Sequence, residues 1–288
     1  MRIRRSALAA IVALVTAMVA TVTSTPAATA DPSARDRPLS VMSFNIHHGV
    51  GTDGRLDLQR IADVVKSEGA DVVGLQEVDR HWSERSDFVD QAAWLARELN
   101  MHVVYGANLD RDPREPGAPR RQYGTAILSE RPIRDWDNTF LPQYEGSEQR
   151  GLLRAHINVR GIWIQVYNTH LQHDDAAERL DQVAAVEELI GEPDESVILL
   201  GDLNATPRSP EIGELMDGLV DSWEEAGVGD GSTYPGDDPR TRIDYVLTSG
   251  DVVTRTAAVV ATDASDHRPV SADVLLPGSS VGGGPNAG

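Results

Sequence analysis

The chain has 288 residues, of which 45 are acidic and 26 are Lys or Arg, and its formal net charge is −19. Such acidity disfavours a tight, nonspecific grip on nucleic acid, because that binding depends on many Lys and Arg contacts to phosphate. The sequence has no cysteine, which excludes disulfides, so stability must come from a hydrophobic core or from bound metal.

The first 30 residues have the layout of a cleaved secretory signal. Three arginines within residues 2–5 precede the apolar run ALAAIVALVTAMVATV, and the small-residue stretch AATA ends at Ala30. We therefore expect secretion, although the apolar run is close to the length of a membrane span and a retained anchor is the alternative. Loss of this segment, which contains three arginines and no acidic residue, changes the net charge from −19 to −22.

The remaining chain is long enough for one large α/β domain, which we predict at residues 38–277. Residues 31–37 are predicted to be a flexible N-terminal segment, and the Gly-rich residues 278–288 a disordered tail. In chain order the apolar pattern predicts strand 39–46, helix 56–69, strand 71–78, helix 87–100, strands 101–107, 123–129, 151–159 and 162–171, helix 174–191, and strands 196–204, 242–247 and 270–276.

The order of these elements is not a simple alternation of strand and helix. Adjacent strands between residues 122 and 170 imply antiparallel hairpins, which favours mixed sheets packed together with helices outside. Residues 109–124 hold four arginines and three prolines, and we predict a loop there. That loop either binds a second phosphate or a lipid head group, or is solvated and balanced by its own acidic residues. The larger aromatic residues, Trp136, Phe140, Tyr144, Trp163 and Trp223, are predicted mostly in the core.

Polar side chains of the metal-binding and proton-transferring kinds stand at the ends of several predicted strands. They are Asn45, Glu77, Asn168, His170, Asp202, Asn204 and, just before the last strand, Asp266 and His267. Each one alone has an ordinary interpretation as a turn residue or a surface ion pair. Their coincidence indicates a site built from carboxylates, amides and imidazoles.

The motifs SFNIHHG, LQEVD, YGTAILS, NTHL, GDLNATP, RIDYVL and SDHRPV occur in this order between about Leu39 and Leu276. They resemble those of the endonuclease/exonuclease/phosphatase superfamily, which includes deoxyribonucleases, sphingomyelinases and inositol-polyphosphate phosphatases. One departure is Thr125, where many members have Asn or Gly. The resemblance implies an α/β (α+β) fold, a four-layer αββα sandwich of two mixed, mostly antiparallel sheets flanked by helices. It also implies a metal-dependent phosphohydrolase.

The resemblance implies a role for each site residue. Glu77 would be the principal metal ligand, with Asn45 and Asp266 near it, and oxygen ligands of this kind suit Mg²⁺, with Mn²⁺ or Ca²⁺ as substitutes. His267 would be the general base, oriented by Asp244, and would give the pH profile an ascending limb near neutrality. Asp202 and Asn204 would orient the water and the phosphate, and His170 would donate a hydrogen bond to a phosphoryl oxygen. His47 and His48 would either line the substrate pocket or be structural.

These observations leave several functions open. The acidic charge favours a secreted, monomeric phosphodiesterase for a small or lipid-linked substrate, similar to a phospholipase C or sphingomyelinase, acting on a phospholipid head group at a membrane surface. A secreted endonuclease shares the same catalytic set, and a phosphomonoesterase of sugar or inositol phosphates is a variant of the first function. A binding protein without enzymatic activity is disfavoured by the complete set. No stable protein partner is implied.

Overall fold

The structure, a computed structural model, describes residues 36–192 and 194–278. The predicted signal segment, residues 31–35 of the predicted flexible segment and residues 279–288 of the predicted tail lie outside this part of the chain. Strand β1 begins at Arg37, whose partner in the neighbouring strand is Leu276, so the first strand starts one residue before the predicted domain. Within the described residues, no helix is long and apolar enough to cross a membrane.

Two six-stranded sheets form the centre of the domain. The first has the order β11-β12-β1-β2-β4-β3 and consists of β1 (Arg37–Asn45), β2 (Val72–Arg80), β3 (His102–Arg111), β4 (Arg121–Ser129), β11 (Val253–Val259) and β12 (Val270–Leu276). The second has the order β5-β6-β7-β8-β10-β9 and consists of β5 (Ile133–Phe140), β6 (Gly151–Val159), β7 (Ile162–His170), β8 (Ser196–Asp202), β9 (Leu219–Asp221) and β10 (Asp244–Ser249). Each sheet has one parallel pair, β1 with β2 and β7 with β8.

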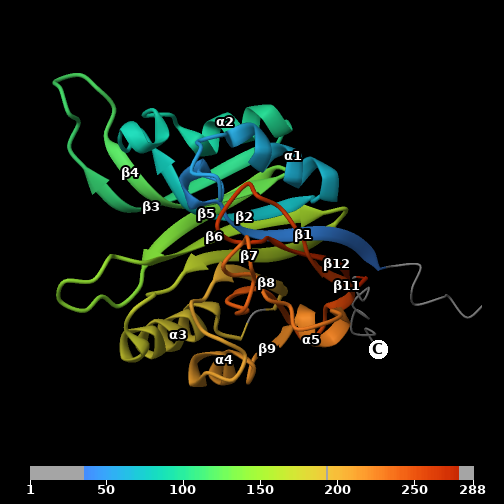
Figure 1. The fold of residues 1–288 in the computed structure, drawn as a ribbon. Helices are drawn as coiled ribbons and strands as arrows, with labels where there is room; N and C mark the ends of the chain where they lie inside the picture. Colours follow the sequence, from blue (N-terminus) through green and yellow to red (C-terminus); the bar gives the residue numbers. More distant parts are fainter. Residues whose placement is uncertain (1–35, 193, 279–288) are drawn as a thin grey trace, which may run out of the picture. The chain divides into compact units, whose positions relative to one another are not determined.

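Helices cover the outer face of each sheet, and apolar residues fill the space between the sheets (Figure 1). Helices α1 (Leu58–Glu68) and α2 (Gln91–Leu99) pack on the first sheet, while α3 (Ala176–Ile190) and α4 (Pro210–Leu215) pack on the second. Helix α5 (Ser222–Ala226) contacts β10 and β11. An aspartate side chain caps the first turn of α1, α2 and α3, which supplies acceptors for free backbone amides. The four-layer sandwich predicted from the sequence is therefore confirmed.

The structure differs from the predicted pattern where strands are short or lie at an edge. β5, β9 and β11 were missed, and β5 is an edge strand whose exposed polar residues give no clear apolar alternation. For the same reason Trp136 and Phe140 are not core residues, with 50% and 59% of their surface exposed, and Tyr144 is exposed as well. The predicted loop 109–124 is instead a β3–β4 hairpin, because Arg111 and Arg121 extend the two strands and leave only residues 112–120 as a loop.

Asn168 joins the two sheets at the point where β2 changes direction. The pairing of β2 with β4 shifts register between Leu75 and Val78, and such a bulge leaves backbone groups without ladder partners. The buried Asn168 amide donates to the carbonyls of Leu75 and Ala126 at 2.9 and 2.8 Å and accepts from Gln76 at 2.6 Å. This residue, which the sequence placed among the polar strand ends, supports the bulge that carries Glu77.

We expect Asn168→Ala to lower the free energy of unfolding by about 3 kcal/mol, because it removes three buried hydrogen bonds, to Leu75, Ala126 and Gln76. Urea unfolding followed by circular dichroism measures this change. Asn158→Ala is the matched control, since Asn158 makes an exposed hydrogen bond to Gly161 in a turn and its loss should change stability little. Equal, small effects of the two substitutions would contradict a bridging role for Asn168.

Candidate active site

The polar strand ends predicted from the sequence meet at one edge of the sandwich. Asn45 is the last residue of β1 and Glu77 lies in the bulged part of β2. In the second sheet, Asp202 ends β8 and stands opposite both His170 of β7 and Asp244 of β10. The carboxyl ends of the parallel strands β1 and β2, and of β7 and β8, lie at the same edge of their sheets, and the antiparallel β10 begins there with Asp244.

A buried acid and imidazole cluster occupies the centre of this edge. His267 Nδ1 lies 2.9 Å from Asp244 Oδ2, and His267 Nε2 lies 3.7 Å from Asp202 Oδ2. The amide of Asn45 donates to Asp202 Oδ2 at 2.9 Å, and His170 Nε2 lies 3.5 Å from the same oxygen. The backbone amide of Asn204 donates to Asp202 Oδ1. Asp202 is therefore the residue that the other members of the cluster share.

The two carboxylates decide the protonation of this cluster. Burial lowers the pKa of His267, but the charges of Asp244 and Asp202 outweigh burial and raise that pKa to about 10. Burial and the charge of Asp244 raise the pKa of Asp202 to about 7. The sequence predicted His267 as the group that titrates near neutrality. In the structure Asp202 is that group, because the register of β8 places a second carboxylate beside the imidazole.

The raised pKa of His267 predicts how stability changes with pH. A histidine whose pKa is higher in the folded state stabilises that state fully below its ordinary pKa of 6.5, and the contribution is lost as pH rises toward about 10. We expect the difference in unfolding free energy between the wild type and Asp244→Asn to shrink across this interval in EDTA-treated protein. NMR titration of the His267 ring should show it protonated at neutral pH.

The substitution Asp237→Asn is the control for this titration, because Asp237 is an exposed carboxylate of a neighbouring turn. It should leave the His267 titration unchanged, whereas Asp244→Asn should move it to lower pH. An imidazole that is already neutral at neutral pH in the wild type would contradict the assigned charge state.

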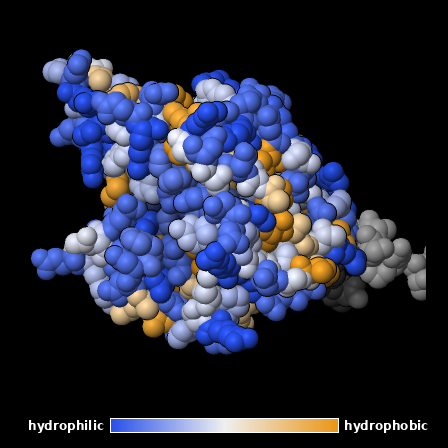
Figure 2. All heavy atoms as spheres, in the orientation of Figure 1, coloured by the Kyte–Doolittle hydropathy of each residue, from blue (hydrophilic) through white to orange (hydrophobic). Residues whose placement is uncertain are grey.

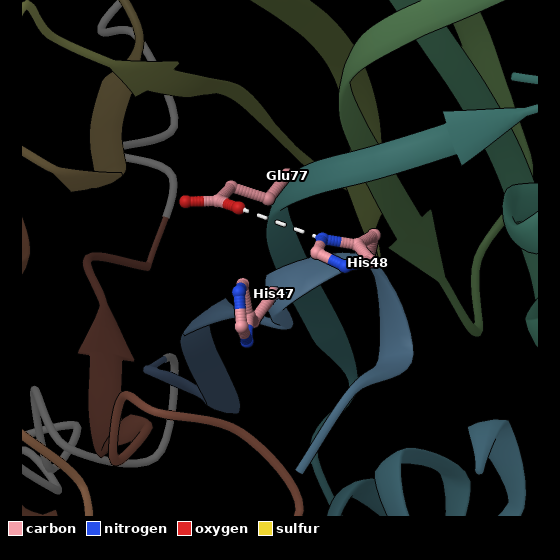
Figure 3. Close-up of side chains that lie close together, drawn as sticks. All are labelled: His47, His48 and Glu77. Atoms are coloured by element: carbon pink, nitrogen blue, oxygen red, sulfur yellow. Dashed lines mark ion pairs between the residues drawn. The ribbon is translucent and has the colours of Figure 1, made fainter. Parts of the chain in front are cut away.

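Glu77 lies next to this cluster and has an unusual backbone. Its φ of 57° is in the left-handed region, which is uncommon for a residue other than glycine and is often found at functional sites. The Asn45 amide donates to Glu77 Oε1 at 3.1 Å, and His48 Nδ1 lies 4.0 Å from Glu77 Oε2. Figure 3 shows Glu77 extending from β2 toward His47 and His48 of the short 3-10 helix η2 (His47–Gly49).

The groups around Glu77 fit a divalent cation. Ligand atoms of Glu77, His47 and His48 lie within 4.8 Å of one another, and His47 Nδ1 lies 3.7 Å from Asp266 Oδ1. Burial, with the nearby charges of Arg85 and His47, lowers the pKa of His48 to about 3, so its ring is neutral. The His48 Nδ1 atom is buried without a hydrogen-bond partner. Two carboxylates, an amide and a neutral imidazole are a suitable donor set.

The remaining predicted residues lie at the same edge with different surroundings. Asn204 has a φ of 50°, and its side chain donates to the carbonyl of Leu171. His170 is buried, and burial together with the charge of Arg150 keeps its pKa well below the ordinary value, so it is neutral. Asp266 is bound by Ser265, whose hydroxyl also donates to the carbonyl of Asn45. All eight predicted site residues thus belong to one continuous region.

Two functional candidates were missed by the sequence interpretation. The ring of Tyr234 lies 4.8 Å from the His267 ring, and Tyr234 is 39% exposed, so it forms part of the wall of the site. Its signal was hidden in the turn sequence TYPG. The buried Arg150 pairs with Glu148 at 2.8 Å, and its Nε atom has no hydrogen-bond partner among the described residues. An arginine just ahead of an apolar strand carries no distinctive pattern.

Residues 42–267 match the sequence profile of the Endonuclease/Exonuclease/phosphatase family, which is most of the chain. The chain belongs to this family. Its members are phosphoric ester hydrolases that depend on a divalent metal, and the cluster described above agrees with that chemistry. The enzyme class and the family predicted from the sequence are therefore confirmed.

Known proteins share the family and much of the chain. The uncharacterized protein YbhP of Escherichia coli (strain K12) is 28% identical over 257 residues, which cover 82% of this chain and 96% of YbhP. The 5'-tyrosyl-DNA phosphodiesterase of Caenorhabditis elegans is 30% identical over 200 residues, which cover 66% of this chain and 48% of that protein. The crystal structure of an endonuclease/exonuclease/phosphatase from Beutenbergia cavernae superimposes with a TM-score of 0.70 at 28% identity, covering 83% of this chain and 72% of that one.

Proposed function

We propose that this metal-dependent phosphoesterase is a secreted phosphodiesterase that hydrolyses a small or lipid-linked phosphodiester. The observation that carries the proposal is the shared carboxylate of Asp202, which lies between the His267–Asp244 pair and the Asn45 amide that also contacts Glu77. Asp202 as a proton acceptor, the protonated His267 ring and the Glu77 carboxylate as a metal ligand thus lie side by side. This is the arrangement that attack of water on a phosphate ester requires.

The residues divide the reaction between them. A divalent cation held by Glu77, Asn45 and Asp266 would neutralise negative charge that develops on the phosphoryl oxygens and the leaving group.

Asp202, whose pKa is about 7, is poised to accept the proton of the attacking water at neutral pH. His267, held charged by Asp244, would then stabilise a phosphoryl oxygen by a charge-assisted hydrogen bond. The near-neutral pKa of Asp202 favours this residue as the base, in place of His267, which the resemblance implied.

Charge and surface composition support a small or lipid-linked substrate. The net charge of −19 works against the long phosphate backbone of duplex DNA. The face of the domain in Figure 2 is predominantly hydrophilic, and its hydrophobic residues lie in small separate groups. Such a face suits a polar head group better than deep insertion into lipid. We propose Mg²⁺ as the metal, a monomeric state, and export directed by the first 30 residues.

A nuclease-like activity is the second candidate. It is favoured by one observation, the 30% identity to the 5'-tyrosyl-DNA phosphodiesterase of C. elegans, whose name gives a phosphodiester of tyrosine and DNA as its substrate. That reaction needs only the end of a nucleic acid in the site, so it is compatible with an acidic protein.

A substrate panel separates the two candidates. The full chain, stripped with EDTA and supplied with Mg²⁺, Mn²⁺ or Ca²⁺, is assayed on phosphatidylinositol, sphingomyelin, phosphatidylcholine, plasmid DNA, RNA, tyrosyl-DNA and soluble phosphate esters. We expect a small or lipid-linked phosphodiester to be hydrolysed with the highest kcat/KM. A clear preference for DNA or tyrosyl-DNA would replace it with the second candidate.

N-terminal sequencing of exported protein tests the signal, and material that begins at Met1 would contradict cleavage near Ala30.

A further inference from the structure

A cavity of about 710 Å³ lies between the β3–β4 hairpin and the segment that follows β2. His81 and Phe88 line one side of it, and Arg114, Glu115 and Arg121 line the other. The hairpin extends beyond the first sheet (Figure 1), and Arg114 near its tip pairs with Glu84 of the segment between β2 and α2. None of these residues takes part in the catalytic cluster, so the cavity is free for another role.

Two arginines at the base of this hairpin break a rule of sheet pairing. Arg111 of β3 and Arg121 of β4 are direct cross-strand partners, and like charges opposite each other destabilise a strand pair. Among the residues that the structure describes, neither has a carboxylate partner: Arg111 makes no ion pair, and Arg121 donates only to the backbone carbonyl of Asp112. In a protein with 45 acidic residues, two adjacent cations without a carboxylate partner form a local positive patch that suits an anionic ligand.

Arg120, the neighbouring arginine of the same hairpin, is neutralised by carboxylates. Arg120 forms ion pairs with Asp110 at 2.6 Å and with Asp112 at 2.8 Å. Arg120 therefore engages Asp110 and Asp112, and neither aspartate forms an ion pair with Arg111 or Arg121 among the described residues.

An aromatic ring contacts Arg111 close to the strand that carries Glu77. The Arg111 guanidinium lies 4.6 Å from the centre of the Trp82 ring, and the Trp82 ring lies 5.9 Å from that of Tyr123. Tyr123 is two residues from Arg121 on the same strand face, and its cross-strand partner in β2 is Asp79. Trp82 follows Glu77 by five residues and lies just after the end of β2. The arginines are therefore on the side of Glu77 toward which β2 runs.

We propose that Arg111 and Arg121 bind a second phosphate group of the substrate, beside the phosphodiester that is hydrolysed. This inference rests on the proposed phosphodiesterase function and narrows the substrate to one with two phosphate groups. Guanidinium groups recognise phosphate by paired, charge-assisted hydrogen bonds, and Arg121 also lines the cavity, whose volume has room for a sugar or inositol ring. The second phosphate belongs either to a phosphorylated head group or to an adjacent nucleotide, and the chemistry at the arginines is the same.

Direct binding tests the two arginines without any catalysis. Inorganic phosphate is titrated into the EDTA-treated full chain while the indole signal of Trp82 is followed by NMR, assigned with Trp82→Phe. We expect a saturable shift of this signal, and a loss of phosphate affinity of about tenfold in Arg111→Gln and in Arg121→Gln. Arg120→Gln removes the same charge from a paired position and should bind phosphate as the wild type does. An unperturbed Trp82 signal, or equal affinity in all variants, overturns the proposal.

Matched substrates then identify the source of the second phosphate. Glycerophosphoinositol is compared with glycerophosphoinositol 4-phosphate, and the dinucleotide TpT with its 5'-phosphorylated form. The member with the extra phosphate should have a KM lower by about tenfold in one of the pairs, and this advantage should disappear in Arg111→Gln and Arg121→Gln. Hydrolysis of bis(p-nitrophenyl) phosphate, which has one phosphate, should be unchanged in both variants.

The outcomes separate this inference from the proposed function. If bis(p-nitrophenyl) phosphate is hydrolysed but neither pair shows a preference, the second-phosphate site is wrong and the phosphodiesterase stands. If no diester is hydrolysed, the proposed function fails, and the phosphate titration at Trp82 still decides whether the arginines bind an anion.

Discussion

We expect Glu77→Gln to lower kcat by about a thousandfold, which corresponds to roughly 4 kcal/mol of transition-state stabilisation. The substitution keeps the size of the side chain and its contact with the Asn45 amide but removes the negative charge that attracts a divalent cation. The fold should be intact, because Glu77 is partly exposed and the bulge around it is supported by Asn168. Steady-state hydrolysis of bis(p-nitrophenyl) phosphate at increasing Mg²⁺, together with circular dichroism, measures both effects.

Glu98→Gln is the control for this substitution. Glu98 is an exposed residue near the end of α2, where it pairs with Lys66, so its replacement should leave kcat and the Mg²⁺ dependence unchanged. Nearly normal turnover of Glu77→Gln at limiting Mg²⁺ would remove Glu77 from the metal site.

The second large effect is expected at the His267–Asp244 pair. We expect His267→Ala to lower kcat by about a hundredfold to ten-thousandfold, and Asp244→Asn to lower it substantially, because the imidazole loses the carboxylate that orients and charges it. The double variant should be little worse than His267→Ala alone, since the two residues serve one step. Losses that add fully in free energy would show that the residues act independently.

The pH profile of the same variants distinguishes the two possible bases. With Asp202 as base, activity should rise with pH through a pKa near 7 as its carboxyl group loses the proton. The negative charge of Asp244 raises that pKa, so in Asp244→Asn the rising limb should move to lower pH. It should be absent in Asp202→Asn. A limb that persists in Asp202→Asn and vanishes in His267→Ala would restore His267 as the base predicted from the sequence.

The sequence was sufficient to predict mixed sheets with helices outside, because its buried strands have continuous apolar runs and its long helices have clear ends. The four-layer arrangement was implied by the family resemblance. Gly69 follows α1 in the left-handed conformation, and Asp175 caps α3, as helix signals of this kind require. The edge strand β5 was not predicted, because its exposed residues do not repeat with the period of a half-buried strand. Burial in the finished sheet, rather than local preference, defines such a strand.

The residues of the site could be predicted from the sequence, but their protonation states could not. Polar residues at strand ends are visible in a single sequence, and Asp202 and His267 were found in that way, whereas Asp244 was implied by the family resemblance. The charge on His267 depends on two carboxylates that approach from different strands, and the register between β8 and β10 fixes their positions. In the same way, the opposition of Arg111 and Arg121 follows from the register of β3 and β4 and has no signature along the chain.

Metal-dependent hydrolysis of a simple phosphodiester tests the central claim most directly. The full chain is stripped with EDTA, and the hydrolysis of bis(p-nitrophenyl) phosphate is measured before and after Mg²⁺, Mn²⁺ or Ca²⁺ is returned. We expect no hydrolysis in the stripped protein and a saturable recovery with one of the three metals, which Glu77→Gln should abolish at the same metal concentration. Hydrolysis that resists EDTA, or none with any of the three metals, would contradict a phosphodiesterase that depends on a metal held by Glu77.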